Sequence, residues 1–161
     1  MGPARRRNRH GQALVEFALI VPIFLLILMG ILDLGRAVYA SSTINNAARE
    51  AGRRAIVDQT CQNVIGVAVK HSVALGALPI SVTWLAPDGS VIASCPTSPT
   101  GNSVSDIANV RVTYVYTAAT PLISQLLGPI TMVGETKFPI EATCVDSTPG
   151  DLTDGKCPAG G

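Results

Sequence analysis

Gly11 and Glu16 stand at the start of a long apolar run, and their types and spacing suggest a functional pair. The stretch GQALVEF, residues 11–17, places a carboxylate five positions after a glycine. Residues 17–32 that follow carry no charge. An ionisable side chain within an apolar membrane segment is costly unless it is paired, and it is a functional candidate by default. Glu16 is therefore the first candidate, and its role depends on what the apolar run is.

The cysteines form a second group that can do chemistry. Their positions, all after the apolar run, are Cys61, Cys95, Cys144 and Cys157. An even number of cysteines in a chain sent out of the cytoplasm indicates disulfides. Three pairings are possible, and we favour Cys61–Cys95 with Cys144–Cys157, because the second bond would tie the C-terminal tail to the last predicted strand. There is no C-x-x-C motif and only His71 accompanies the cysteines, so we expect no metal site.

Motifs of catalysis are absent from the sequence. Of two histidines, one lies within the first eleven residues, and there is no serine-nucleophile motif, no H-E-x-x-H and no Gly-rich nucleotide fingerprint. We therefore expect no enzyme, no cofactor and no small-molecule substrate. The formal net charge of +1 gives no overall basic field, so nucleic acid is not an expected partner.

The apolar run has the length and the flanking charges of a membrane span. Residues 12–34 would form a helix of roughly 34 Å, and a hydrocarbon core of about 30 Å needs ~20 residues. Pro22 lies inside the run and is expected to bend the helix. The first eleven residues contain no acidic residue and four basic ones, which are Arg5, Arg6, Arg7 and Arg9. This asymmetry predicts a single-pass protein of the cytoplasmic (inner) membrane with its N-terminus inside.

Three interpretations of this N-terminus remain open. A secretory signal peptide could be cut after AVYA, residues 37–40, although Asp33 and Arg36 intervene and the helical pattern continues through that site. The second interpretation is an uncleaved anchor, in which Glu16 is a boundary residue at the headgroups. The third is a prepilin-type leader, cut before the apolar helix, and it alone explains Glu16.

The third interpretation follows from a resemblance. G-QALVE-F resembles the processing site of Flp-type (type IVb) prepilins and pseudopilins, in which an aspartic prepilin peptidase cuts after the glycine. The resemblance implies that Gly11 ends the leader and that Gln12 becomes the mature N-terminus. Glu16 and Phe17 are then residues five and six of the mature chain. Within an assembly, the Glu16 carboxylate would pair with the new α-amine of a neighbouring subunit.

A longer stretch, residues 11–55, resembles the TadE-like proteins of tight-adherence (Tad, or Flp) pilus systems. The similarity rests on ALVEFAL, on the proline within the apolar run, on GILDLGR at its end and on the alanine-rich NNAAREAGRRA. It implies a small bitopic pseudopilin that takes part in assembly of the pilus or of a related secretion machine. The implied partners are the membrane, prepilin peptidase, other Tad pilins or pseudopilins and the inner-membrane assembly platform. The alternative is a generic bitopic envelope protein whose extracytoplasmic domain binds a ligand and has no pilus role.

The rest of the chain predicts an α+β domain. The helix should continue beyond the span for about forty residues in all, with a pair between Glu50 and Arg54 on its polar side. Its narrow apolar face is Leu34, Ala37, Val38, Ser41, Ile44, Ala48, Ala51 and Ala55. A second helix is expected at about 62–75, two short strands about a PDG turn from residue 80, a strand at NVRVTYVY, a short helix at TPLISQLLG, and one or two strands after it.

These predictions divide the chain into four parts. Residues 1–11 are a basic leader, 12–34 the transmembrane helix, 35–146 an extracytoplasmic domain and 147–161 a mobile tail. The fold class is thus a transmembrane helix that continues into a long amphipathic helix, followed by a small domain of mixed helix and antiparallel strands.

Overall fold

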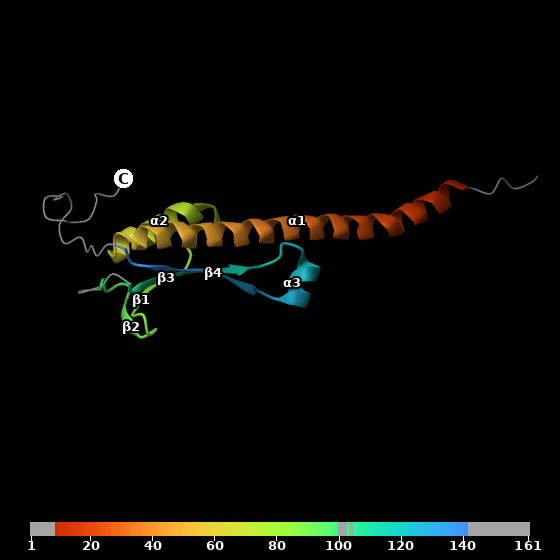
Figure 1. The fold of residues 1–161 in the computed structure, drawn as a ribbon. Helices are drawn as coiled ribbons and strands as arrows, with labels where there is room; N and C mark the ends of the chain where they lie inside the picture. The colour runs from red at the N-terminus through yellow and green to blue at the C-terminus, as the bar shows by residue number, and fades with distance from the viewer. Residues whose placement is uncertain (1–8, 100–102, 104, 142–161) are drawn as a thin grey trace, which may run out of the picture.

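The protein combines one very long helix with an antiparallel sheet, as the α+β prediction stated (Figure 1). A computed structural model describes residues 9–99, 103 and 105–141. The helices are α1 (Arg9–Ala55), α2 (Cys61–Ser72), the 3-10 helix η1 (Val73–Leu75) and α3 (Pro121–Leu127). The strands are β1 (Ile80–Leu85), β2 (Val91–Ser94), β3 (Ile107–Tyr116) and β4 (Ile130–Pro139). The basic residues Arg5, Arg6 and Arg7 and the predicted tail lie outside the described residues.

Helix α1 runs without a break from the apolar segment into the folded domain. Its 47 residues extend over roughly 70 Å at 1.5 Å per residue. In Figure 1 its N-terminal part stands clear of the sheet and curves in its red portion. Pro22 lies inside the helix, where it removes one main-chain hydrogen bond. The continuous helix predicted from the sequence is therefore confirmed.

The sheet has the strand order β2-β1-β3-β4, and every neighbouring pair is antiparallel. The predicted hairpin about the PDG turn joins β1 to β2. In this turn the Asp88 side chain accepts a hydrogen bond of 2.8 Å from the Ser90 N–H, and Gly89 has a φ of +86°. Strands β3 and β4 pair over ten residues each, from Ile107 opposite Pro139 to Tyr116 opposite Ile130. The sequence predicted one or two strands after the short helix, and the described residues form one, β4.

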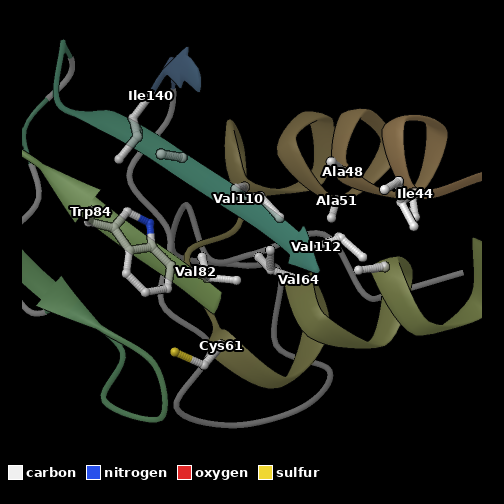
Figure 2. Packing of buried hydrophobic residues seen from close by; sticks show 14 residues of the cluster. Ile44, Ala48, Ala51, Cys61, Val64, Val82, Trp84, Val110, Val112 and Ile140 are labelled. Atoms are coloured by element: carbon white, nitrogen blue, oxygen red, sulfur yellow. The ribbon is translucent and has the colours of Figure 1, made fainter. Parts of the chain in front are cut away.

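The core lies between one face of the sheet and the helices α1 and α2. Every second residue of the central strands points into the core, including Val82 and Trp84 of β1 and Val110 and Val112 of β3 (Figure 2). The helices contribute Ile44, Ala48, Ala51, Cys61 and Val64. The strand predicted at NVRVTYVY is confirmed, and its side facing the core carries Val110, Val112 and Tyr116, which are buried, and Tyr114, which is half-buried.

The buried face of α1 differs from the predicted one. Leu34 and Val38 are exposed, so their assignment to the apolar face was wrong. The buried positions are Asp33, Ala40, Ile44, Ala47, Ala48, Ala51, Gly52 and Ala55. The two sets share Ile44, Ala48, Ala51 and Ala55, so the prediction is confirmed for the second half of the face. Nearer the N-terminus the domain contacts Asp33 and covers Ala40, a different side of the helical turn from Leu34 and Val38.

Strand β4 lies very close to α1 because each carries a glycine at the contact: Gly134 of β4 faces α1, and Gly52 of α1 faces β4. A Cβ on Gly134 of β4 would lie 2.6 Å from the carbonyl oxygen of Ile44 in α1. A Cβ on Gly52 of α1 would lie 2.8 Å from a ring carbon of Phe138 and closer still to a methyl of Thr136. The small residues of α1 thus allow the backbone of the helix to rest on the edge of the sheet.

A disulfide joins Cys61, the first residue of α2, to Cys95 just after β2, across a sequence separation of 34. It is the first of the two bonds favoured from the sequence. The second candidate pair, Cys144 and Cys157, lies outside the described residues.

Candidate membrane-anchoring and assembly site

The apolar part of α1 presents its side chains to the outside on every face. Between residues 11 and 32, every residue except Val21 and Gly30 is exposed. The large apolar side chains of this stretch other than Val21 are between 41% and 69% exposed. Soluble monomers rarely show a contiguous apolar surface of this extent. By length and composition α1 is a candidate membrane span, which is consistent with a membrane protein.

The predicted processing site lies in the first turns of this helix. Gly11 and Gln12 are exposed, and nothing lies within 4 Å of the position that a Gly11 Cβ would occupy. The bond between residues 11 and 12 therefore lies on an exposed part of the helix.

Glu16 lies one helical turn after Gln12, and the two side chains are in contact. The Gln12 amide Nε2 donates a hydrogen bond of 3.1 Å to Glu16 Oε1. Among residues 11–99, 103 and 105–141, no cation pairs with this carboxylate. Phe17 beside it is 67% exposed. The structure therefore brings Gln12 and Glu16 together and leaves the negative charge of Glu16 without a cationic partner in these residues.

The domain holds α1 at Asp33, directly after the apolar run. One oxygen of the Asp33 carboxylate accepts a hydrogen bond of 2.9 Å from the Ala119 N–H, and the other accepts one of 3.0 Å from the Thr120 N–H. The Tyr116 hydroxyl donates one of 2.7 Å to the Asp33 carbonyl oxygen. Arg36 Nη1 lies 3.6 Å from the carboxylate. This junction fixes the domain against the end of the apolar helix.

Sequence analysis missed the role of Asp33, although a signal was present. Asp33 directly follows sixteen uncharged residues, and Arg36 comes one turn later. A carboxylate at the end of an apolar membrane segment is costly unless it is paired, so partners for Asp33 were to be expected. The partners themselves come from residues 116–120, and nothing in the sequence relates them to residue 33. Burial, first of all, and the negative charge of Asp33 raise the pKa of the Tyr116 hydroxyl above its usual value.

The arginines near the end of α1 are held by acids, and their pairing differs from the predicted one. Arg53 pairs with Glu50 at 3.1 Å. Arg54 donates two hydrogen bonds, of 3.0 and 2.7 Å, to one oxygen of the fully buried Asp58. The predicted pair of Glu50 with Arg54 was wrong, because Asp58 in the loop after the helix offers Arg54 a buried partner. Arg49 and Arg53 are exposed.

A family comparison bears on the N-terminal helix. The sequence model of the family described as "TadE-like protein" matches residues 11–53. No curated protein and no solved structure was found to match the chain. The match begins at the proposed processing glycine and covers the apolar run, Asp33 and most of the helix that packs on the sheet. The resemblance is thereby confirmed over these residues: the long N-terminal helix of this chain is similar to the TadE-like family.

Proposed function

We propose that the protein is a membrane-anchored pseudopilin that takes part in assembly of a Tad/Flp-type (type IVb) pilus or a related secretion machine. The observation that carries this proposal is the uncharged helix of residues 17–32, most of which is exposed and clear of the domain, within a stretch that matches the TadE-like family. Its role is structural rather than catalytic. Its partners are the prepilin peptidase, other Tad pilins or pseudopilins and the inner-membrane assembly platform.

In this proposal α1 crosses the cytoplasmic membrane with its N-terminus inside and the sheet domain outside the cytoplasm. Prepilin peptidase removes residues 1–11, and the new α-amine of Gln12 in one subunit pairs with Glu16 of a neighbour. One feature supports the pairing. The charge of Glu16 has no cationic partner among the described side chains, and its hydrogen bond there is with the side-chain amide of Gln12 in the same chain. A carboxylate in an apolar environment is stabilised by a cationic partner.

The test is the intact mass of the membrane-extracted protein from cells with a working prepilin peptidase. We expect a chain that begins at Gln12, and a Gly11→Leu variant that stays uncut because the leucine side chain obstructs the peptidase. Gly35→Leu is the matched control, since Gly35 lies in the same helix with nothing within 4 Å of its Cβ position. An N-terminus at Ser41 would indicate a secretory signal peptide. An intact Met1 would favour a plain anchor with an extracytoplasmic binding domain.

A further inference from the structure

Helix α3 and the start of β4 form an apolar surface that no other described part of the protein covers. Leu126 is 83% exposed and Leu127 60%, and Ile130 is also exposed. No Asp, Glu, Lys, Arg or His occurs anywhere from residue 112 to residue 134. The domain's exposed charged side chains, such as Arg53, Lys70 and Lys137, belong to other segments. We call Leu126, Leu127 and Ile130 the α3 surface.

The α3 surface lies beside the end of the apolar run of α1. A mostly apolar cavity of about 230 Å³ separates the two, lined from α1 by Gly30, Asp33, Leu34 and Ala37 and from the other side by residues that include Ile123, Leu127 and Ile130. Ile123 Cδ1 lies 3.9 Å from the position of a Gly30 Cβ. Figure 1 shows α3 beside the middle of α1, where the free part of the helix begins.

The position of α3 along α1 corresponds to a boundary of the membrane. The uncharged run ends at Leu32, and ~20 residues at 1.5 Å per residue reach back about 30 Å, which is one hydrocarbon thickness. When α1 crosses the bilayer, α3 beside Gly30 and Asp33 therefore stands at the outer edge of the hydrocarbon. Arg36, one turn beyond Asp33 and exposed, is at the level of the headgroups, where basic side chains extend toward phosphates.

Two hydrogen bonds attach the start of α3 to α1. The two N–H groups that the Asp33 carboxylate accepts belong to Ala119 and Thr120, and Thr120 is the residue directly before α3. The acid at the end of the apolar run thus holds the start of α3, and its own charge is satisfied within the protein. The depth of Leu126 and Leu127 is set by α1 itself.

We propose that the α3 surface is a second membrane contact, in which Leu126, Leu127 and Ile130 insert into the interfacial layer of the outer side of the bilayer beside α1. This inference rests on the proposed function, because it needs α1 to cross the membrane. The ligand is the lipid boundary between headgroups and acyl chains, where exposed leucines next to uncharged polar residues such as Ser124 and Gln125 are favoured. The contact orients the sheet domain relative to the membrane, so that the charged residues of α2 and β4 face water.

The test uses the full chain reconstituted in phosphatidylethanolamine–phosphatidylglycerol vesicles. Leu126→Trp places a fluorophore on the α3 surface, and its high exposure means that the core is not disturbed. Val91→Trp is the matched control, because Val91 is also apolar and is 65% exposed but lies in β2. That strand adjoins β1, which pairs with β3 at residues 107–112, away from the end that leads to α3. The fully buried Trp84 gives a constant background that the unmodified chain measures.

We expect lipids brominated on the upper acyl chain to quench the emission that the tryptophan of Leu126→Trp adds and to leave the emission of Trp84 almost unchanged. The emission of Val91→Trp should not be quenched by these lipids beyond the response of the unmodified chain. Emission from Leu126→Trp that is quenched by aqueous acrylamide and not by brominated lipid would overturn the inference. Protection from both quenchers would also overturn it, since a second copy or a protein partner would then cover the surface. Flotation of each variant with the vesicles separates the two proposals: a chain that floats without lipid quenching refutes only the α3 contact, whereas a chain that does not float refutes the anchor as well.

Discussion

The Tyr116 hydroxyl lies 2.7 Å from the main-chain carbonyl oxygen of Asp33, a residue 83 positions earlier in the chain. The bond joins the last residue of β3 to α1 directly after the apolar run. Together with the two N–H groups that the Asp33 carboxylate accepts, it makes the junction between the span and the domain a defined contact. Movements of the domain relative to the apolar helix therefore require these bonds to break.

Asp33→Ala is expected to lower the free energy of unfolding of the domain. The substitution leaves the N–H groups of Ala119 and Thr120 without their acceptor, and an unsatisfied, partly buried donor costs about 1–3 kcal/mol. Urea unfolding of the full chain in detergent, followed by circular dichroism, measures the change. Asp88→Ala is the control, because Asp88 accepts an N–H in an exposed turn where water can replace it. Equal losses in the two variants would show that the junction contributes nothing beyond an ordinary turn.

The junction also predicts a loss of stability at alkaline pH. Burial, chiefly, and the charge of Asp33 raise the pKa of Tyr116 in the folded protein above the ordinary value of about 10. The folded state therefore holds the phenol proton more tightly than the unfolded state does. The stabilisation is complete below the ordinary pKa and is lost as pH rises through the higher folded-state pKa. Tyr116→Phe should unfold with a flatter pH dependence above pH 10, whereas Tyr39→Phe, which removes an exposed hydroxyl, should follow the unmodified chain.

Replacing Gly134 by alanine tests the close contact between β4 and α1. The new methyl would lie 2.6 Å from the Ile44 carbonyl oxygen, and forcing atoms into a packed contact typically costs about 1–3 kcal/mol. Gly66→Ala is the matched control with the opposite sign. Gly66 lies in α2 with nothing within 4 Å of its Cβ position, and alanine in a helix interior is favoured over glycine by about 0.5–1 kcal/mol. Melting temperatures that rise for both variants would mean that β4 does not rest on the backbone of α1.

Removing the Cys61–Cys95 bond is expected to destabilise the domain. A cross-link that closes a loop of this length stabilises by roughly 3–4 kcal/mol in the chain-entropy model. The denaturation midpoint of the unmodified chain should therefore fall when reductant is added. The double variant Cys61→Ala with Cys95→Ala should start near the lowered midpoint and respond little further. A double variant that keeps the full response to reductant would assign the effect to Cys144 and Cys157 instead.

Local patterns explain what could be predicted from the sequence. The long helix, the PDG hairpin and the alternation in β3 each depend on residues within a few positions of one another. The Cys61–Cys95 bond was favoured among three possible pairings only because its companion, Cys144–Cys157, would tie the tail to the last strand. What the sequence could not show depends on distant partners. Asp33 receives its hydrogen bonds from residues 116–120, and Arg54 turns away from Glu50 because a buried Asp58 lies beyond the end of the helix.

The same limit explains the error on α1. Both candidate faces, one through Leu34 and Val38 and the other through Asp33 and Ala40, fit the helical period. Only the position of the sheet decides between them, and the sheet approaches where Gly52 and Gly134 permit it. Sequence alone favoured the more apolar residues at 34 and 38. Both residues are exposed, Leu34 to 65% and Val38 to 58%.

Glu16→Gln distinguishes an assembly residue from a boundary residue. Glu16 is exposed, and among the described side chains its one hydrogen bond is with Gln12, so the substitution should leave the fold of the single chain intact. A residue at the headgroups of a plain anchor would tolerate the change, since membrane carboxylates are costly. A residue that pairs with the Gln12 α-amine of a neighbouring subunit would not. Removing one partner of a buried ion pair typically costs about 3–5 kcal/mol.

Such a loss corresponds to about two to four orders of magnitude in an association constant, at 1.4 kcal/mol per decade. We therefore expect the variant to insert and accumulate normally while co-purification with other pilins, and piliation itself, are lost. Intact mass must first show that the variant is cut after Gly11, so that a processing defect is not taken for an assembly defect. Glu50→Gln is the matched control, because it removes a carboxylate from the same helix in the part that packs on the domain. Normal piliation by a correctly cut Glu16→Gln variant would leave Glu16 without a role in assembly, whatever the function of the rest of the helix.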